Sequence, residues 1–274
     1  MFCAAVLQTM GGPTAEIPFE YRDGLIWLKV RAEGAPEPLN FLLDSGASVS
    51  VIDLGTAQRL GLKLAGRVSV RGVQTETAGH WPQRLKASVS EVPLPRDFLA
   101  LDLQKLSKAC AHRVDGLVGA DFFRDRVVQV DFAACVVRLL ATAPAKADES
   151  LSLEIQKDVL RVPVAVNGGK PQWMRLDTGC ASALQWVSTA RPTATAATRR
   201  RMSVGLAEVS VAMASTTVAL GKLRFESVPT GVHSKQIFTG ESGLLGNGLL
   251  SRFIVTVDAP NKRLLLSKLP DPAR

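Results

Sequence analysis

The chain has 274 residues, enough for one large domain or two mid-sized domains that each have a core. Its 46% hydrophobic and 21% charged residues are ordinary for a globular protein, and no run approaches the 18 apolar residues of a membrane-spanning helix. The net charge of +8 comes from scattered basic residues, and the one dense run, Arg199–Arg201, is interpreted as a solvated loop. With few aromatics and no recognition motif, we expect no nucleic-acid partner and no membrane span.

The first half reads as short strands joined by tight turns. Ile17–Val30 holds two strand signals around a turn at Arg22–Gly24. Asp53–Leu62 has helical spacing of its apolar residues, which predicts a short helix. Val68–Val89 alternates apolar and polar residues, with a turn expected around Ala78–Gly79, and so predicts a hairpin.

The second half restarts in the same way. Leu151–Ile155 alternates, and Val162–Val166 predicts a strand. Val204–Leu220 and Leu223–Val232 predict two more strands, while Thr189–Arg201 is the least regular stretch. The fold class expected from these patterns is all-β with few short helices.

One short motif occurs in both halves of the chain. Phe41–Ser48 and Trp173–Cys180 each contain an apolar run that ends on an Asp, a hydroxyl residue and a Gly. A single copy is typical of a strand-to-turn junction, where these residues are favoured. Two copies, with Asp44 and Asp177 at matching places, can bring two carboxylates together.

A second motif follows each copy of the first. Gly116–Gly119 and Gly243–Gly246 are both Gly-apolar-apolar-Gly, and each precedes two predicted strands. Asp44 and Asp177 are 133 residues apart, and Gly119 and Gly246 are 127 apart, so the features recur in one order at nearly one period. This repeat indicates a duplication, with domains at 15–141 and 150–270 joined by a small, Pro-containing linker at 141–147.

The cysteines and histidines show no metal-ligand spacing, so we expect neither a metal nor a cofactor. Cys110 and Cys135 flank one strand-turn region and could form a disulfide or remain free thiols. The apolar N-terminus, Met1–Leu7, lacks a basic region and a full hydrophobic region. It is interpreted as either the remnant of an export or lipoprotein signal or a disordered tail; this slightly favours the periplasm or cell envelope over the cytoplasm.

The doubled pattern resembles the aspartic peptidases, specifically the bacterial retropepsin-like group with two lobes in one chain. The resemblance rests on the two Asp turns and the two Gly-apolar-apolar-Gly elements, and it covers residues 15 to 270. It implies two similar β-barrel-like lobes related by a pseudo-two-fold axis, with Asp44 and Asp177 as the catalytic pair. By the same resemblance, Ser45 and Thr178 hydrogen-bond across the axis.

Further roles follow for the small residues of the two turns. Gly46 and Gly179 let the backbone approach its partner and the substrate. Gly119 and Gly246 let the neighbouring strand pass beneath each Asp turn. Ser48 is placed so that its hydroxyl can reach the outer oxygen of Asp44.

The chain departs from the family pattern at two places. Cys180–Ala181 stands where the second turn would carry a hydroxyl, so Asp177 lacks that support unless Ser182 supplies it. Tyr21 is the single tyrosine and precedes Asp44, so the flap tyrosine of pepsin-like enzymes is absent. The hairpin at 70–85 is the flap candidate, with His80 and Trp81 expected near its turn and in contact with substrate; Trp81 could instead pack onto the barrel.

Two carboxylates a few ångströms apart share one proton, and such a pair can activate a water to hydrolyse a peptide bond without a metal. The sequence therefore predicts an aspartic endopeptidase that acts on peptide or protein substrates. The alternative is a catalytically impaired peptide-binding or structural module of the same fold. Because the linker is short, we expect a monomer with both lobes in one chain.

Overall fold

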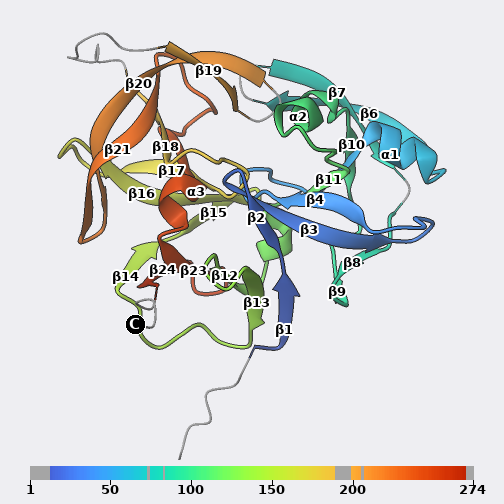
Figure 1. Cartoon of the computed structure of the whole chain (residues 1–274), viewed down its shortest axis with the longest axis horizontal. Coiled ribbons are helices and arrows are strands. Elements are labelled where there is room, and N and C mark those ends of the chain that lie inside the picture. The colour runs from blue at the N-terminus through green and yellow to red at the C-terminus, as the bar shows by residue number, and fades with distance from the viewer. Residues whose placement is uncertain (1–12, 73–74, 83, 189–198, 205–206, 270–274) are drawn as a thin grey trace, which may run out of the picture.

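The computed structural model describes residues 13–72, 75–82, 84–188, 199–204 and 207–269. The predicted all-β fold class with few short helices is confirmed, since most elements are strands, arranged in three sheets, and the helices are short (Figure 1). The apolar N-terminus with Cys3, and most of the irregular stretch from Thr189, lie outside the described residues. None of the described helices is long and apolar enough to cross a membrane.

The first sheet is made entirely of residues from the first half of the chain. Its order is β6 (Leu64–Gly72), β7 (Thr75–Pro82), β10 (Leu99–Leu101), β5 (Val51–Asp53), β11 (Gly116–Val118), β4 (Leu39–Leu43), β3 (Leu25–Ala32), β8 (Ala87–Val89) and β9 (Val92–Pro93), with β2 (Glu20–Arg22) paired to β3. Here β11 runs parallel to β4 and antiparallel to β5, and β10 runs parallel to β5.

The second sheet is made of residues from the second half. Its order is β15 (Glu154–Gln156), β16 (Val159–Val166), β17 (Gln172–Asp177), β22 (Gly243–Gly246), β18 (Leu184–Val187), β21 (Leu223–His233), β20 (Ala207–Leu220) and β19 (Arg199–Val204). Read from β19 to β15, this order corresponds to the order β6, β7, β10, β5, β11, β4, β3, β2 of the first sheet. The parallel pairings also correspond: β22 with β17 matches β11 with β4, and β21 with β18 matches β10 with β5.

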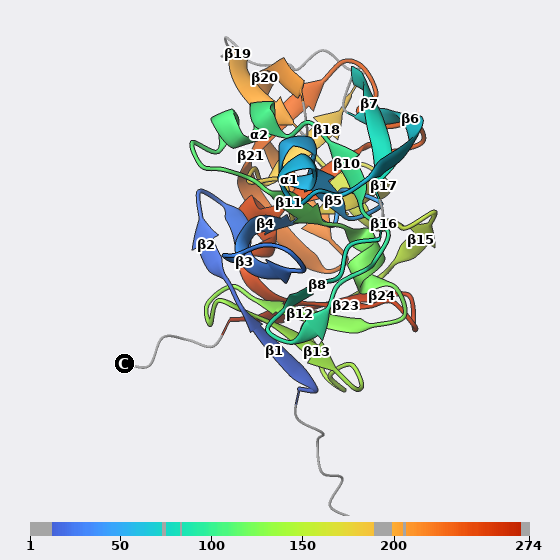
Figure 2. The ribbon, with the colours of Figure 1, turned by 90° about the vertical axis from the view of Figure 1, so that its right-hand side faces the viewer.

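The third sheet joins the two halves. Its six strands run in the order β1 (Ala15–Pro18), β13 (Val136–Leu140), β12 (Val127–Asp131), β23 (Phe253–Asp258), β24 (Arg263–Lys268) and β14 (Glu149–Ser152). Figures 1 and 2 both place this sheet at one end of the molecule, below the strands that lead to Asp44 and Asp177. Three strands come from each half, and the halves meet at β12 and β23.

Residue types explain these elements locally. β16 alternates buried and half-buried residues along its length, which is the two-residue period of a strand with one face on the core. β4 is buried on both faces, so it is an almost continuous apolar run. The predicted helix after the first Asp turn is α1 (Leu54–Arg59); its N-cap Asp53 accepts a hydrogen bond from the Thr56 amide at 2.9 Å.

The hairpin turn predicted at Ala78–Gly79 is wrong. β6 and β7 pair from Leu64↔Pro82 to Gly72↔Thr75, so Ala78 and Gly79 lie within a strand, and residues 73–74 lie outside the described part of the chain. Gly79 is a residue of strand β7, and a Cβ there would lie 2.8–2.9 Å from side-chain atoms of Leu101 and Val70. The glycine therefore serves close packing between strands.

Three further differences concern segments without a strong pattern. Arg199–Arg201, interpreted as a solvated loop, belongs to β19 and pairs with β20. A helix that was not predicted, α2 (Gln104–Ala109), follows β10 and buries none of its residues. Cys110 and Cys135 are free thiols, so the disulfide alternative does not hold.

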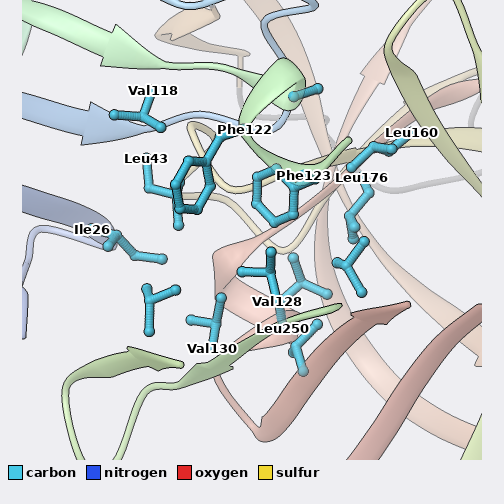
Figure 3. Close-up of a cluster of buried hydrophobic side chains, with 14 of the residues drawn as sticks. Ile26, Leu43, Val118, Phe122, Phe123, Val128, Val130, Leu160, Leu176 and Leu250 are labelled. Atoms are coloured by element: carbon cyan, nitrogen blue, oxygen red, sulfur yellow. The ribbon is translucent and has the colours of Figure 1, made fainter. Parts of the chain in front are cut away.

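The core runs through both halves beneath the Asp turns. Phe122 and Phe123, in the 3-10 helix η1 (Ala120–Phe123), pack edge to face at 5.8 Å between ring centres. Figure 3 shows these rings among Leu43 and Val118 of the first half and Leu176 and Leu250 of the second, the last from α3 (Asn247–Leu250). The strands that end at the two aspartates therefore stand on one shared apolar layer.

Candidate active site

Asp44 and Asp177 lie at matching ends of β4 and β17. β11 runs parallel to β4 with Val118 beside Leu43, and the Asp44 amide donates to the Val118 carbonyl at 2.9 Å. In the second sheet β22 runs parallel to β17 with Gly246 beside Asp177. Asp44 thus directly follows β4, and Asp177 is the last residue of β17. Each of these strands is hydrogen-bonded to a parallel neighbour.

Four hydrogen bonds lock the two Asp turns together. The Ser45 hydroxyl donates to the Leu176 carbonyl at 2.8 Å, and the Thr178 hydroxyl donates to the Leu43 carbonyl at 2.8 Å. In return, the Ser45 amide donates to the Thr178 hydroxyl at 2.9 Å, and the Thr178 amide donates to the Ser45 hydroxyl at 3.0 Å. All four bonds are buried, so water cannot replace them.

We expect Thr178→Val to lower the free energy of unfolding by about 2–4 kcal/mol, because it leaves the buried Ser45 amide and Leu43 carbonyl without partners. Thr217→Val on β20 is the matched control, since that hydroxyl donates to Glu226 at the surface and its loss should cost at most about 0.5 kcal/mol. Urea denaturation of both variants measures the difference. Equal losses would contradict a special role for the buried bonds.

The two carboxyl groups lie side by side across the locked turns, and each affects the pKa of the other. Each is also covered by a glycine of the opposite turn: a Cβ on Gly46 would lie 2.5–2.7 Å from the Asp177 carboxylate, and a Cβ on Gly179 would collide with that of Asp44. Any larger residue at Gly46 or Gly179 would push the pair apart.

Burial raises the pKa of both carboxyl groups. For Asp44 burial is the main cause, and it is opposed by hydrogen bonds from the Gly46 and Ala47 amides. The pKa of Asp177 lies well above its usual range, because burial and the charge of Asp44 act in the same direction. The arrangement favours a pair that holds one proton.

The hydrogen bonds around the two carboxylates are unequal. Asp44 Oδ1 accepts from the amides of Gly46 and Ala47 at 3.0 and 3.2 Å, whereas Asp177 Oδ1 accepts from the Gly179 amide at 2.9 Å. The amide of Cys180, which corresponds to Ala47, donates to the backbone carbonyl of Asp177 at 3.3 Å. Asp44 is therefore the better-supported anion.

The hydroxyl groups considered as support for the pair, those of Ser48 and Ser182, make no hydrogen bond to it within the described part of the chain. The Ser182 hydroxyl instead contacts the Cys180 thiol at 3.0 Å and accepts from Gln185 Nε2 at 2.7 Å. Burial and the nearby Asp177 raise the pKa of the Cys180 thiol to about 12, so the sulfur stays protonated.

Gly119 and Gly246 sit where the chain crosses beneath each Asp turn. A Cβ on Gly119 would lie 2.5 Å from the backbone of Val49, and one on Gly246 would meet the backbone carbonyls of Cys180 and Ser182. Backbone cannot move aside as a flexible side chain can. Both positions therefore exclude side chains, as the sequence predicted.

His80 and Trp81 do not lie near the turn of their hairpin. They stand at the end of β7, where His80 pairs with Arg67 and with Ala100 of β10, and Trp81 is 39% exposed. The difference follows from the position of Gly79, which lies inside β7 and not at the reversal of the chain. Their contact with substrate stays a prediction.

Sequence reasoning missed two charged residues and one amide beside the turns. Arg175 and Glu241 form a buried ion pair next to Asp177, and Asn247 Nδ2 donates to the carbonyls of Thr178 and Gly24 at 2.7 and 2.8 Å. A lone arginine inside an otherwise apolar strand signal could have marked the first. Asn247 directly follows the second Gly-apolar-apolar-Gly element, at the place of Ala120, and nothing in the pattern distinguished it.

The described residues hold no group of three or more His, Cys, Asp and Glu side chains that could bind a metal ion. No curated protein matches the chain. Residues 28–122, about a third of the chain, match the family model described as aspartyl protease. That segment contains Asp44, its turn and Gly119, and the match supports an aspartic protease family for this protein.

Proposed function

We propose that the protein is an aspartic endopeptidase of the retropepsin-like, two-lobe type, with Asp44 and Asp177 as its catalytic pair. The observation that carries this proposal is the contact of the Asp44 and Asp177 carboxyl groups across turns that four reciprocal, buried hydrogen bonds lock together. A strand-to-turn junction alone does not require a second carboxylate at its side.

Two lobes at 15–141 and 150–270, related by a two-fold axis, are part of the proposal. The first two sheets share one strand order, which supports an internal duplication. In the joining sheet Val127 pairs with Asp258 and Asp131 pairs with Ile254. At the 127-residue offset of Gly119 and Gly246, Val127 corresponds to Ile254 and Asp131 to Asp258, so the two pairs exchange. An axis near Gln129 and Thr256 accounts for this register.

The proposed reaction needs one proton on the pair. Asp44, with two amide donors, is the ionised member, and Asp177, with its pKa well above the usual range, holds the proton. The Asp44 carboxylate takes a proton from water, the water oxygen bonds to the carbonyl carbon, and the Asp177 proton passes to the carbonyl oxygen. When the C–N bond breaks, Asp44 returns its proton to the leaving amine and the gem-diol proton returns to Asp177.

The test is peptide hydrolysis across pH with mass-spectrometric identification of the products. We expect cleavage at acidic pH that a chelator leaves unchanged and that statine-type mimics of the tetrahedral intermediate block. Peptide binding without cleavage would support the impaired binding module instead. Cleavage that the chelator abolishes would assign the activity to a different site or to a contaminant.

A further inference from the structure

A buried arginine stands two residues before Asp177. Arg175 lies on β17 and is 8% exposed, inside a strand whose last four residues are all buried. Leu42, two residues before Asp44, is the corresponding residue of β4, and it packs in an apolar cluster. The strand that leads to Asp177 therefore carries a positive charge at this position, whereas the strand that leads to Asp44 carries an apolar residue.

Arg175 uses its guanidinium to join three separate segments. Its Nε and Nη2 donate to the two oxygens of Glu241 at 2.7 and 2.6 Å, which is a bidentate pair. Its Nη1 donates to the carbonyl of Gly46 at 2.8 Å, in the turn of Asp44. The ring of Phe238 covers the guanidinium at 3.6 Å from the ring centre.

The Gly46 peptide is the point where this contact reaches the carboxylates. The amide of Gly46 donates to Asp44 Oδ1 at 3.0 Å, and its Cα faces the Asp177 carboxylate with no room for a side chain. Arg175 thus extends from the strand of Asp177 to hold the turn that orients Asp44. A rotation of this turn would move Asp44 and uncover Asp177 together.

A buried ion pair is a costly way to hold a turn. Taking two charges out of water costs more than packing apolar residues of similar size, so a buried pair is weak support for stability as such. Leu42 shows that an apolar residue fills the corresponding place in the first sheet. This comparison points to a task at Arg175 that an apolar residue cannot do.

We propose that Arg175 is a positioning residue of the Asp44–Asp177 pair: held by Glu241, it fixes the Gly46 turn and supplies a buried cation beside the two carboxyl groups. The inference rests on the proposed function for its kinetic consequences. Its electrostatic consequence, a change in how the pair titrates, does not require turnover.

The charged groups around Arg175 set the sign of the effect. Glu241 faces it from the loop before β22, and Arg161 faces Glu241 from β16 at 3.7 Å, with Glu154 beyond it at 3.6 Å. The positive charge of Arg175 lowers the pKa of both Asp44 and Asp177 and so opposes the effect of burial. Removing the cation should raise the pKa of both carboxyl groups, and removing the negative charge of Glu241 should lower the pKa of both.

The experiment compares Arg175→Gln, Arg175→Lys and Glu241→Gln with Arg161→Gln as the matched control. For Arg175→Gln we expect both limbs of the kcat/KM profile to move upward by about 1 pH unit. We expect its kcat to fall roughly 10- to 100-fold at its own optimum, with little change in KM, because the Asp44 turn loses its anchor. Arg175→Lys keeps the charge but cannot bind Glu241 in a bidentate manner, so it should lower kcat while the limbs stay in place.

Glu241→Gln should move the limbs in the opposite direction, to lower pH. Arg161→Gln should move them less than Arg175→Gln does, because Arg161 lies beyond Glu241 from the turn. If the Arg175 variants lower only the melting temperature and leave kcat and both limbs unchanged, the residue is merely structural and the inference is wrong. Limbs that move in the same direction in Arg175→Gln and Glu241→Gln would also overturn it.

A second measurement separates this inference from the proposed function. Titration of ¹³C-labelled Asp carboxyl groups by NMR follows the pair directly, with Asp44→Asn and Asp177→Asn used to assign the signals. If the wild-type protein shows no peptidase activity, the function fails, yet an upward shift of both signals in Arg175→Gln would still support the role of Arg175. Signals that titrate as in the wild type would overturn the inference whatever the activity.

Discussion

Asp44→Asn and Asp177→Asn are each expected to lower kcat/KM by about 10⁴-fold or more, with the double variant no worse than either single one. The two carboxyl groups act as a unit, so the loss of either removes the proton transfer that needs both. An Asn cannot accept the water proton in place of Asp44 or donate a proton in place of Asp177. Single-turnover cleavage of a fluorogenic peptide at the pH optimum measures the loss.

The control for this prediction is Asp97→Asn, which changes an exposed carboxylate that pairs with Arg84 at 3.5 Å. We expect its activity to match that of the wild type. Because Asn is close to Asp in size and removes a like-charge contact, neither site variant should melt below the wild type at neutral pH. Activity within tenfold of the wild type in either site variant would rule out the pair as the catalytic centre.

Gly179→Ala is expected to lower kcat/KM by about 10²-fold or more and to lower the free energy of unfolding by about 1–3 kcal/mol. The new methyl group would collide with the Asp44 carboxylate. The backbone cannot withdraw, because Thr178 is tied to Ser45 and Leu43. The carboxylate must therefore leave its position beside Asp177.

Gly55→Ala, in the first turn of α1, is the matched control. The nearest atom to its new methyl group is Asp53 Oδ2 at 3.2 Å, at the end of a side chain, and Ala favours a helix over Gly. We expect no loss of activity and little change in stability. Thermal melting and kcat/KM measured on both variants test the contrast, and full activity of Gly179→Ala would show that the two turns are looser than their hydrogen bonds indicate.

The two Asp turns and the glycines beneath them could be predicted from the sequence, because each depends on a short local motif that occurs twice. An apolar run that ends in Asp, a hydroxyl residue and Gly predicts a buried strand and a tight turn, and its recurrence predicts that the two turns meet. The structure brings Ser45 and Thr178 into contact across them. The glycines at 119 and 246 were likewise predictable, since a strand that passes under a turn leaves no room for a side chain.

The rest depended on distant contacts. Gly79 has the local sequence of a turn, but it is a strand residue whose lack of a side chain makes room for Leu101 and Val70, and these contacts are not visible in the local sequence. α2 buries none of its residues fully and packs only Leu106 against an apolar cluster, so its sequence shows no helical period of apolar residues. Arg175 and Glu241 are 66 residues apart, and their pairing was invisible until β17 and the loop before β22 were in place.

The joining sheet also has a consequence for how the protein is made on the ribosome. β12 pairs with β13 on one side, but its other partner, β23, is about 120 residues further along the chain. At typical elongation rates β12 therefore presents an open edge for about 6–25 s. An unpaired edge strand readily accepts a strand from another molecule. Copies of this sequence would therefore pair with each other more readily as nascent chains on neighbouring ribosomes of one messenger RNA than as finished proteins.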